Sequence, residues 1–104
     1  MYRSHNCGEL RIKHVGQEVK LSGWIHKIRD KGSLIWIDLR DRYGITQIII
    51  DTNESSKNLV EQVKKVGREY VISVKGMVKE RESKNPNIGT GDVEITLQEI
   101  EILN

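Results

Sequence analysis

The stretch VKLSGWIHKIRDKGSLIWIDLRDRYGITQIIID, residues 19–51, decides the fold. It contains three consecutive runs in which apolar and polar residues alternate, which is the pattern of β-strands with one buried face. In the second run, Ile35, Ile37 and Leu39 share the face that we expect to lie in the core. The opposite face carries Trp36, a large aromatic side chain outside the core and close to basic residues. An aromatic ring in such surroundings suits a flat ligand such as a nucleic-acid base.

The runs on either side of Trp36 extend this pattern. The first run is long and has Gly23 at its centre, where we expect a β-bulge that lets the strand turn between two parts of a small barrel. Residues 30–33 (DKGS) predict a hairpin loop in which Gly32 adopts positive φ. In the third run Thr46, Ile48 and Ile50 face inward, so Gln47 faces outward.

The remainder of the chain predicts one helix and two more strands. Residues 51–55 offer several helix N-caps, and an apolar stripe of Leu59, Val63 and Val66 follows, with Gly67 placed to end the helix. Alternation returns over residues 70–81 and again over 92–103, on either side of a loop that holds the one proline. These ranges define the fourth and fifth strands.

Five strands with a helix between the third and the fourth are typical of the oligonucleotide-binding barrel, the OB-fold, a five-stranded Greek-key barrel. The fold class is therefore all-β with one helix, and a sandwich fragment or another small barrel is the alternative. We expect residues 18–104 to form the barrel and residues 1–17 an N-terminal cover, with a short helix over residues 8–15 in which Leu10, Ile12 and Val15 share one side.

Length and composition bound the function. A chain of 104 residues is one domain, and a net charge of +2 is too small to attract polyanions over the whole surface, so nucleic-acid binding needs a local patch. The single cysteine, Cys7, rules out an internal disulfide and is expected to be buried. We find no zinc-ligand spacing, membrane-length apolar run or signal-like segment, and expect a soluble protein of the cytoplasm.

Catalytic motifs are not found in these residues. There is no nucleophile elbow, phosphate-binding glycine loop or metal-ligand cluster, so we assign no catalytic residue and no metal. The acids Asp38 and Asp41 stand among Arg40 and Arg42, where ion pairing is the simpler expectation.

Nucleic-acid binding is better supported, because outward-facing residues of four strands combine on one face. They provide an aromatic plate, an amide, two cations and a carboxylate, namely Trp36, Gln47, Lys79, Arg81 and Glu94. Aromatic stacking and hydrogen bonds to base edges are the means by which unpaired bases are read, and cations hold phosphates. The alternatives are that the N-terminal segment covers Trp36 and that the cations form a solvated face.

Three segments of the sequence resemble a known family. They are CGELR with HVGQEV near the start, GWIHKIRDKGSLIWIDLRDRYGITQ over residues 23–47, and TGDVEI at residues 90–95. Together they resemble the N-terminal anticodon-binding domain of bacterial-type aspartyl-tRNA synthetases, over essentially the full chain. Lysyl and asparaginyl enzymes share the barrel, but LRDRYGITQ resembles the aspartyl branch.

The resemblance implies that this domain binds the anticodon loop of aspartate tRNA. Trp36 takes the place of a phenylalanine that stacks on the central uracil, and Glu94 matches a carboxylate that accepts a hydrogen bond from the final cytosine. Arg29 and Gln47 match positions that contact bases and backbone, whereas Arg81 and Asn85 match loop contacts. Lys27 and Lys79 stand where that family commonly has arginine.

The resemblance also implies a longer enzyme, a class II synthetase and ligase of protein biosynthesis whose separate catalytic domain binds ATP and magnesium and joins aspartate to its tRNA. Such enzymes are typically homodimers. No cofactor is expected for the barrel itself. The alternative function is a free-standing single-strand binder of the cold-shock sort, whose affinity depends on RNA length and salt but not on base order.

Overall fold

The computed structural model describes residues 3–104. Its elements follow the predicted order. The five strands are β1 (Glu18–Asp30), β2 (Leu34–Asp41), β3 (Gly44–Asp51), β4 (Val71–Glu80) and β5 (Val93–Ile102), and the helical elements are a 3₁₀ turn, η1 (Ile12–His14), and α1 (Lys57–Lys64) between β3 and β4.

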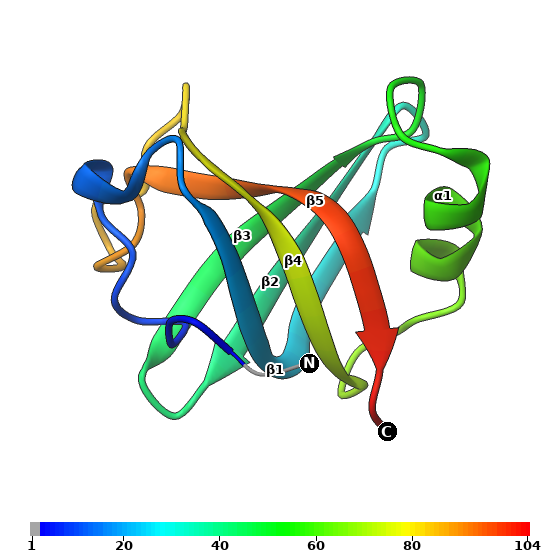
Figure 1. The fold of residues 1–104 in the computed structure, drawn as a ribbon, viewed down its shortest axis with the longest axis horizontal. Coiled ribbons are helices and arrows are strands. Elements are labelled where there is room, and N and C mark those ends of the chain that lie inside the picture. Colours follow the sequence, from blue (N-terminus) through cyan, green and yellow to red (C-terminus); the bar gives the residue numbers. More distant parts are fainter. Residues whose placement is uncertain (1–2) are drawn as a thin grey trace.

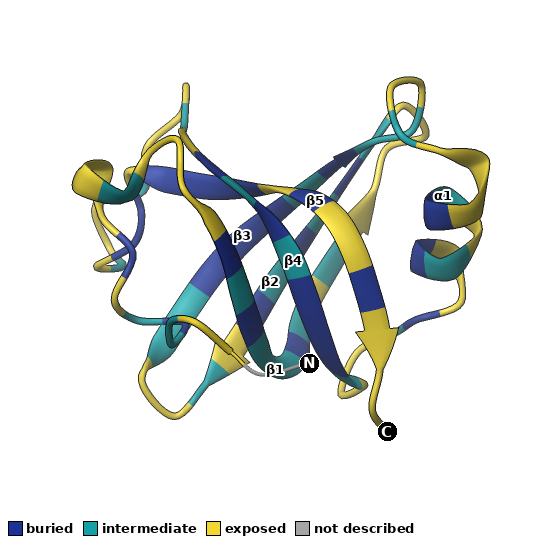
Figure 2. Ribbon diagram, viewed as in Figure 1, coloured by how far each residue is buried: buried dark blue, intermediate teal, exposed yellow. Residues whose placement is uncertain are grey.

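The strands close into a barrel in the order β1-β2-β3-β5-β4 (Figure 1). All neighbouring pairs are antiparallel except β3 and β5, which pair in parallel at Ile48 with Ile95 and at Ile49 with Thr96. This closure confirms the OB-fold and rules out the sandwich. The inward rows expected from alternation are buried, as the dark strand segments in Figure 2 show, and α1 covers one end of the barrel.

The irregularity in β1 lies later than predicted. Gly23 pairs regularly with Ile72 of β4, and the register with β2 shifts between Ile25 and Lys27. Gly23 serves close packing instead, because a Cβ there would lie 2.3 Å from the carbonyl oxygen of Arg40. The shift reverses the parity of the strand, so that Ile28 packs against the core and the cationic residues on either side of it face outward.

The N-cap of helix α1 lies one residue beyond the predicted caps. Ser56, not one of residues 51–55, is the N-cap, and its hydroxyl oxygen accepts a hydrogen bond from the backbone N–H of Leu59 at 3.1 Å. The predicted stripe is buried, including Val66, although the helix ends at Lys64 and not near Gly67.

The N-terminal segment forms less helix than predicted. Within residues 3–17, only the 3₁₀ turn η1 is helical. Ile12 and Val15 are exposed, while Leu10 and Cys7 are fully buried. The short turn lacks the length to present one continuous apolar side. The predicted burial of Cys7 is confirmed. The division into a cover over residues 1–17 and a barrel over 18–104 stays a prediction.

Candidate nucleic-acid interface

The eight residues singled out from the sequence gather on one side of the barrel. Six of them line a hollow of about 630 Å³, here named the Trp36 groove: Arg29, Trp36, Gln47, Lys79, Arg81 and Glu94. An adjoining hollow of about 560 Å³, the Lys27 hollow, is lined by Lys27 and Asn85 and shares Arg29, Gln47 and Arg81 with the groove. The two hollows therefore form one continuous surface to which all five strands and the loop after β4 contribute.

Trp36 is partly exposed at this surface. It pairs with Arg29 of β1, whose guanidinium lies 5.4 Å from the centroid of the indole ring, within the range of a cation–π contact. None of the described residues before Arg29 lines the groove, so the N-terminal segment does not cover the indole. A base that stacks on Trp36 either takes the face opposite Arg29 or displaces the guanidinium.

Gln47 and Glu94 form a hydrogen-bonded pair at the groove. The side-chain amide nitrogen Nε2 of Gln47 donates to Oε1 of Glu94 at 2.8 Å, and Nζ of Lys79 lies 3.5 Å from Oε2. Only 6% of Gln47 and 7% of Glu94 are exposed, much less than their outward rows suggest, since loop residues after β4 line the same groove.

The pair keeps hydrogen-bonding capacity for a ligand. Within residues 3–104, the amide oxygen of Gln47 accepts no bond, and no buried side-chain polar atom is left without a partner, so this oxygen remains accessible. A carboxylate has about four acceptor sites. Glu94 accepts one hydrogen bond here, from Gln47, and forms an ion pair with Lys79. The pair can thus accept from the amino group of a base while its geometry is fixed.

Charge is distributed unevenly over the two hollows. The Trp36 groove is lined by three cationic side chains and three carboxylates. The Lys27 hollow is lined by four cationic side chains and one carboxylate, Asp38. Balanced charge with an aromatic plate suits base edges, whereas cationic excess suits phosphates.

The loop between β4 and β5 is closed at its base. The backbone N–H of Asn85 donates to the carbonyl oxygen of Gly91 at 2.9 Å, and a Cβ at Gly91 would lie only 1.7 Å from the carbonyl oxygen of Asn85. The Asn85 side-chain oxygen accepts from the N–H of Asn87 at 3.0 Å, which leaves its amide NH₂ for a ligand. Glycine at position 91 therefore holds Asn85 beside the hollow.

Some lining residues were not singled out from the sequence. Ser83 and Ile88 belong to the loop, where alternation gives no signal, but Ile49 and Asp38 lie in the same outward rows as Gln47 and Trp36. The expected ion pairing of Asp38 was wrong for residues 3–104, where Asp38 makes no ion pair.

Asp41 also departs from expectation. Its carboxylate lies 3.8 Å from Arg3 and not beside the arginines adjacent in sequence. Its oxygens accept from the backbone N–H groups of Cys7, Tyr43 and Gly44 at 2.8–3.1 Å. Asp41 therefore holds the turn between β2 and β3 and does not face a ligand.

Over residues 3–104, no three His, Cys, Asp or Glu side chains group so as to hold a metal ion. Within the same range, the helices are too short and too polar to cross a bilayer.

Comparison with known proteins relates the chain to an OB-fold family and to aspartate–tRNA ligases. Residues 19–103 match the OB-fold nucleic acid binding domain family of the tRNA anticodon type. The full chain is 58% identical to an aspartate–tRNA ligase of Flavobacterium psychrophilum and spans 18% of that protein. It is 51% identical, over 99% of its length, to an aspartate–tRNA(Asp/Asn) ligase of a Chelativorans species, of which it spans 17%.

Among solved structures, the chain resembles the asparaginyl-tRNA synthetase from Pyrococcus horikoshii. The TM-score is 0.81 with 29% identity, over 96% of this chain and 23% of the other. The predicted resemblance to the aspartyl-tRNA synthetase domain is thus confirmed, and the chain spans about a fifth of the length of these relatives.

Proposed function

Because this chain belongs to the family of OB-fold nucleic acid binding domains, we propose that it is the anticodon-binding domain of an aspartate–tRNA ligase. The Trp36 groove carries this proposal. It brings an accessible indole, an amide and a carboxylate within one hollow, and the sequence is closely similar to ligases that act on aspartate tRNA. These are the groups needed to stack on a base and read its edge.

In the proposed complex, Trp36 stacks on the central uracil of the anticodon. The Gln47–Glu94 pair accepts a hydrogen bond from the amino group of the final cytosine. The loop must be unpaired there, because the base edges of an A-form duplex are out of reach in its narrow groove.

The cationic residues would hold the RNA backbone. Lys27, Arg81 and the amide of Asn85 line the Lys27 hollow, where positive charge exceeds negative charge, and we assign them to phosphates. Lys79 is half exposed beside Glu94 and has a second role, since it fixes the carboxylate as well as adding positive charge.

The wider reaction belongs to the same proposal. A catalytic domain outside residues 1–104 would activate aspartate with ATP and magnesium and transfer it to tRNA, in a homodimeric enzyme of the cytoplasm. This domain would contribute selection of the tRNA through the Trp36 groove.

A stem-loop RNA with the aspartate anticodon tests the proposal directly. We expect binding that weakens by about 1–3 kcal/mol, roughly 5- to 150-fold, in the variant Trp36→Ala, as for the loss of one stacked base. Tyr70→Ala is the matched control, because Tyr70 is an exposed aromatic residue that lines neither hollow.

A stem-loop with a scrambled anticodon separates the two candidate functions. Anticodon binding requires a clear preference for the aspartate sequence. If both loops bind equally, and affinity follows only RNA length and salt, the chain is a general single-strand binder and the proposal is wrong.

A further inference from the structure

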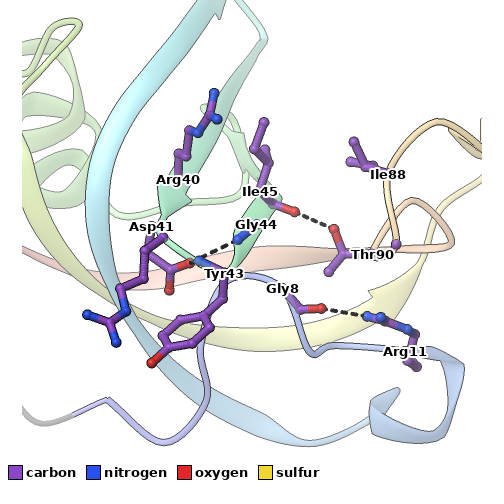
Figure 3. A pocket seen from close by; sticks show the side chains of 11 residues that line it. Gly8, Arg11, Arg40, Asp41, Tyr43, Gly44, Ile45, Ile88 and Thr90 are labelled. Atoms are coloured by element: carbon purple, nitrogen blue, oxygen red, sulfur yellow. Dashed lines mark hydrogen bonds between the residues drawn. The ribbon is translucent and has the colours of Figure 1, made fainter.

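A third hollow of about 450 Å³ lies next to the Lys27 hollow and is not used by the proposed anticodon contacts. We name it the arginine pocket. Its walls come from the N-terminal segment, the turn between β2 and β3 and the loop between β4 and β5 (Figure 3). The lining residues that matter here are Arg11, Arg40, Arg42, Tyr43 and Thr90.

Arg11 is fixed in place on one side of this pocket. Its Nη1 donates to the carbonyl oxygens of Gly8 and Leu10, both at 2.9 Å. Its Nη2 would lie 3.0 Å from a Cβ at Gly89, so the guanidinium packs against the loop between β4 and β5. Since Nη2 makes no hydrogen bond within residues 3–104, Arg11 presents preorganised donors to a ligand.

The other walls are held as well. The Thr90 hydroxyl donates to the carbonyl oxygen of Ile45 and ties the loop to β3 (Figure 3). Arg42 lies 5.2 Å from the centroid of the Tyr43 ring, with Arg3 5.5 Å from it. Hydrogen bonds from Arg42 and then Arg3 lower the pKa of the Tyr43 phenol. With two guanidiniums against its ring, Tyr43 positions Arg42 and does not offer a clear face for stacking.

Positive charge in the pocket is not neutralised. Three arginines face one carboxylate, Asp41, which is already hydrogen-bonded to backbone N–H groups. In the described part of the chain, Arg11, Arg40 and Arg42 form no ion pair with a carboxylate. Guanidinium groups in this state suit phosphate, which they bind through paired N–H donors.

The arginine pocket continues the RNA surface. It shares Ile45 and Ile88 with the Lys27 hollow, which in turn shares residues with the Trp36 groove. Arg40 lies four residues beyond Trp36 on β2, or roughly 13 Å at the rise of a strand. OB-folds bind about 4–16 nucleotides. If an RNA places the three anticodon bases in the first two hollows, the nucleotides next to the triplet can therefore reach the arginine pocket.

We propose that the arginine pocket is a second RNA subsite, which binds backbone phosphates of nucleotides flanking the anticodon triplet on one side. The inference rests on the proposed function. The subsite is independent of base identity, because its charged donors are guanidiniums and its one aromatic ring, Tyr43, is already in contact with two of them, Arg3 and Arg42. The arginine pocket thus adds affinity without base preference, whereas the Trp36 groove supplies the discrimination between bases.

The test uses the double variant Arg40→Ala/Arg42→Ala, since both side chains are exposed and neither supports the fold through a hydrogen bond to the backbone. Lys64→Ala/Arg68→Ala removes the same charge from exposed positions that line none of the three hollows of the RNA surface. The probes are RNAs in which the anticodon triplet is extended by four nucleotides at its 5′ end or at its 3′ end, titrated at several salt concentrations.

We expect the Arg40/Arg42 double variant to bind one of the two extended RNAs roughly 3- to 30-fold more weakly, as for two exposed charge contacts. Its salt dependence, the slope of log K against log[salt], should be shallower by about 1.4 for two phosphates of a single strand. The Lys64/Arg68 variant should bind both RNAs like the unchanged chain.

The outcomes separate the subsite from the function. The subsite is refuted if the Arg40/Arg42 and Lys64/Arg68 variants lose the same affinity for the two extended RNAs, or if neither variant loses any. Either result leaves the preference for the aspartate anticodon intact. If the unchanged chain shows no preference for the aspartate anticodon, the proposed function fails first and the subsite, as part of it, fails too.

Discussion

Replacing Glu94 with glutamine should change which base is preferred at the last anticodon position. The change keeps the shape of the side chain but removes its charge. The glutamine oxygen can still accept from Nε2 of Gln47, the contact that spans 2.8 Å to Oε1 in the present structure. Its NH₂ group would then replace Oε2, which now lies 3.5 Å from Nζ of Lys79.

The magnitude follows from this geometry. A carboxylate accepts from the amino group of cytosine and repels the carbonyl oxygen of uracil, whereas an NH₂ group does the reverse. A correct base contact is worth about 1–3 kcal/mol, so the preference for cytosine over uracil should fall by roughly 5- to 150-fold. Folding stability should change by less than about 1 kcal/mol, because Lys79 is half exposed and its pairing is screened by water.

Fluorescence anisotropy with two stem-loops that differ only in cytosine or uracil at the last position measures this ratio. Urea unfolding of both proteins measures stability. Glu99→Gln is the matched control, since Glu99 also lies on β5 and pairs with a lysine, Lys75, at 3.2 Å but lines none of the three hollows of the RNA surface. An unchanged ratio in Glu94→Gln, or the same change in Glu99→Gln, would refute base reading by Glu94.

Three further predictions concern the fold and its titrating groups. Gly76→Ala should destabilise the protein by about 1–3 kcal/mol or more in urea unfolding, because a Cβ would lie 2.3 Å from a backbone oxygen of β5. The control Gly67→Ala, whose Cβ would lie 3.9 Å from its nearest neighbour, should change the free energy of unfolding by less than about 1 kcal/mol. Equal losses in the two variants would contradict the packing argument. Burial, and next the charge of Asp41, raise the pKa of the Cys7 thiol, so Cys7 should resist a thiol reagent at pH 8 until denaturant is added; rapid labelling of the folded protein would be the contrary result. The ultraviolet titration of the unchanged chain minus that of Tyr43→Phe isolates the Tyr43 phenol. Its pKa should lie below the usual value near 10, since Arg42 and Arg3 stabilise the phenolate. An ordinary pKa would show that the two guanidiniums do not contact the ring.

Much of the fold was predictable because strand alternation is a local signal. The inward row of β2 follows from parity alone and is buried as expected. Parity also places Trp36 and Gln47 on the opposite face, where both line the groove, although Gln47 is buried there. The helix was also predictable, from a stripe that includes Leu59 and Val63. Its exact cap was not, because residues 51–56 contain several side chains able to cap and the choice depends on how the chain leaves β3.

The remaining features depend on contacts between distant segments. The β-bulge after Ile25 lies where β1 stops pairing with β4 and pairs with β2 alone. The residues of β1 by themselves do not indicate this position. Burial of Gln47 and Glu94 requires the loop between β4 and β5 to line the groove. The arginine pocket likewise needs three segments, so Arg11 could not be connected with Arg40 before the fold was known.

The N-terminal segment has a practical consequence for anyone who wishes to reuse this barrel. The match to the barrel family model begins at residue 19, yet Cys7 and Leu10 are fully buried in the core. Gly8 lies so close to the turn at Tyr43 that even a methyl group would not fit between them. A minimal scaffold trimmed to residues 19–103 would therefore lose two buried residues of the hydrophobic core, Cys7 and Leu10. Libraries built on this framework should retain the leading residues and vary the RNA-facing strands instead.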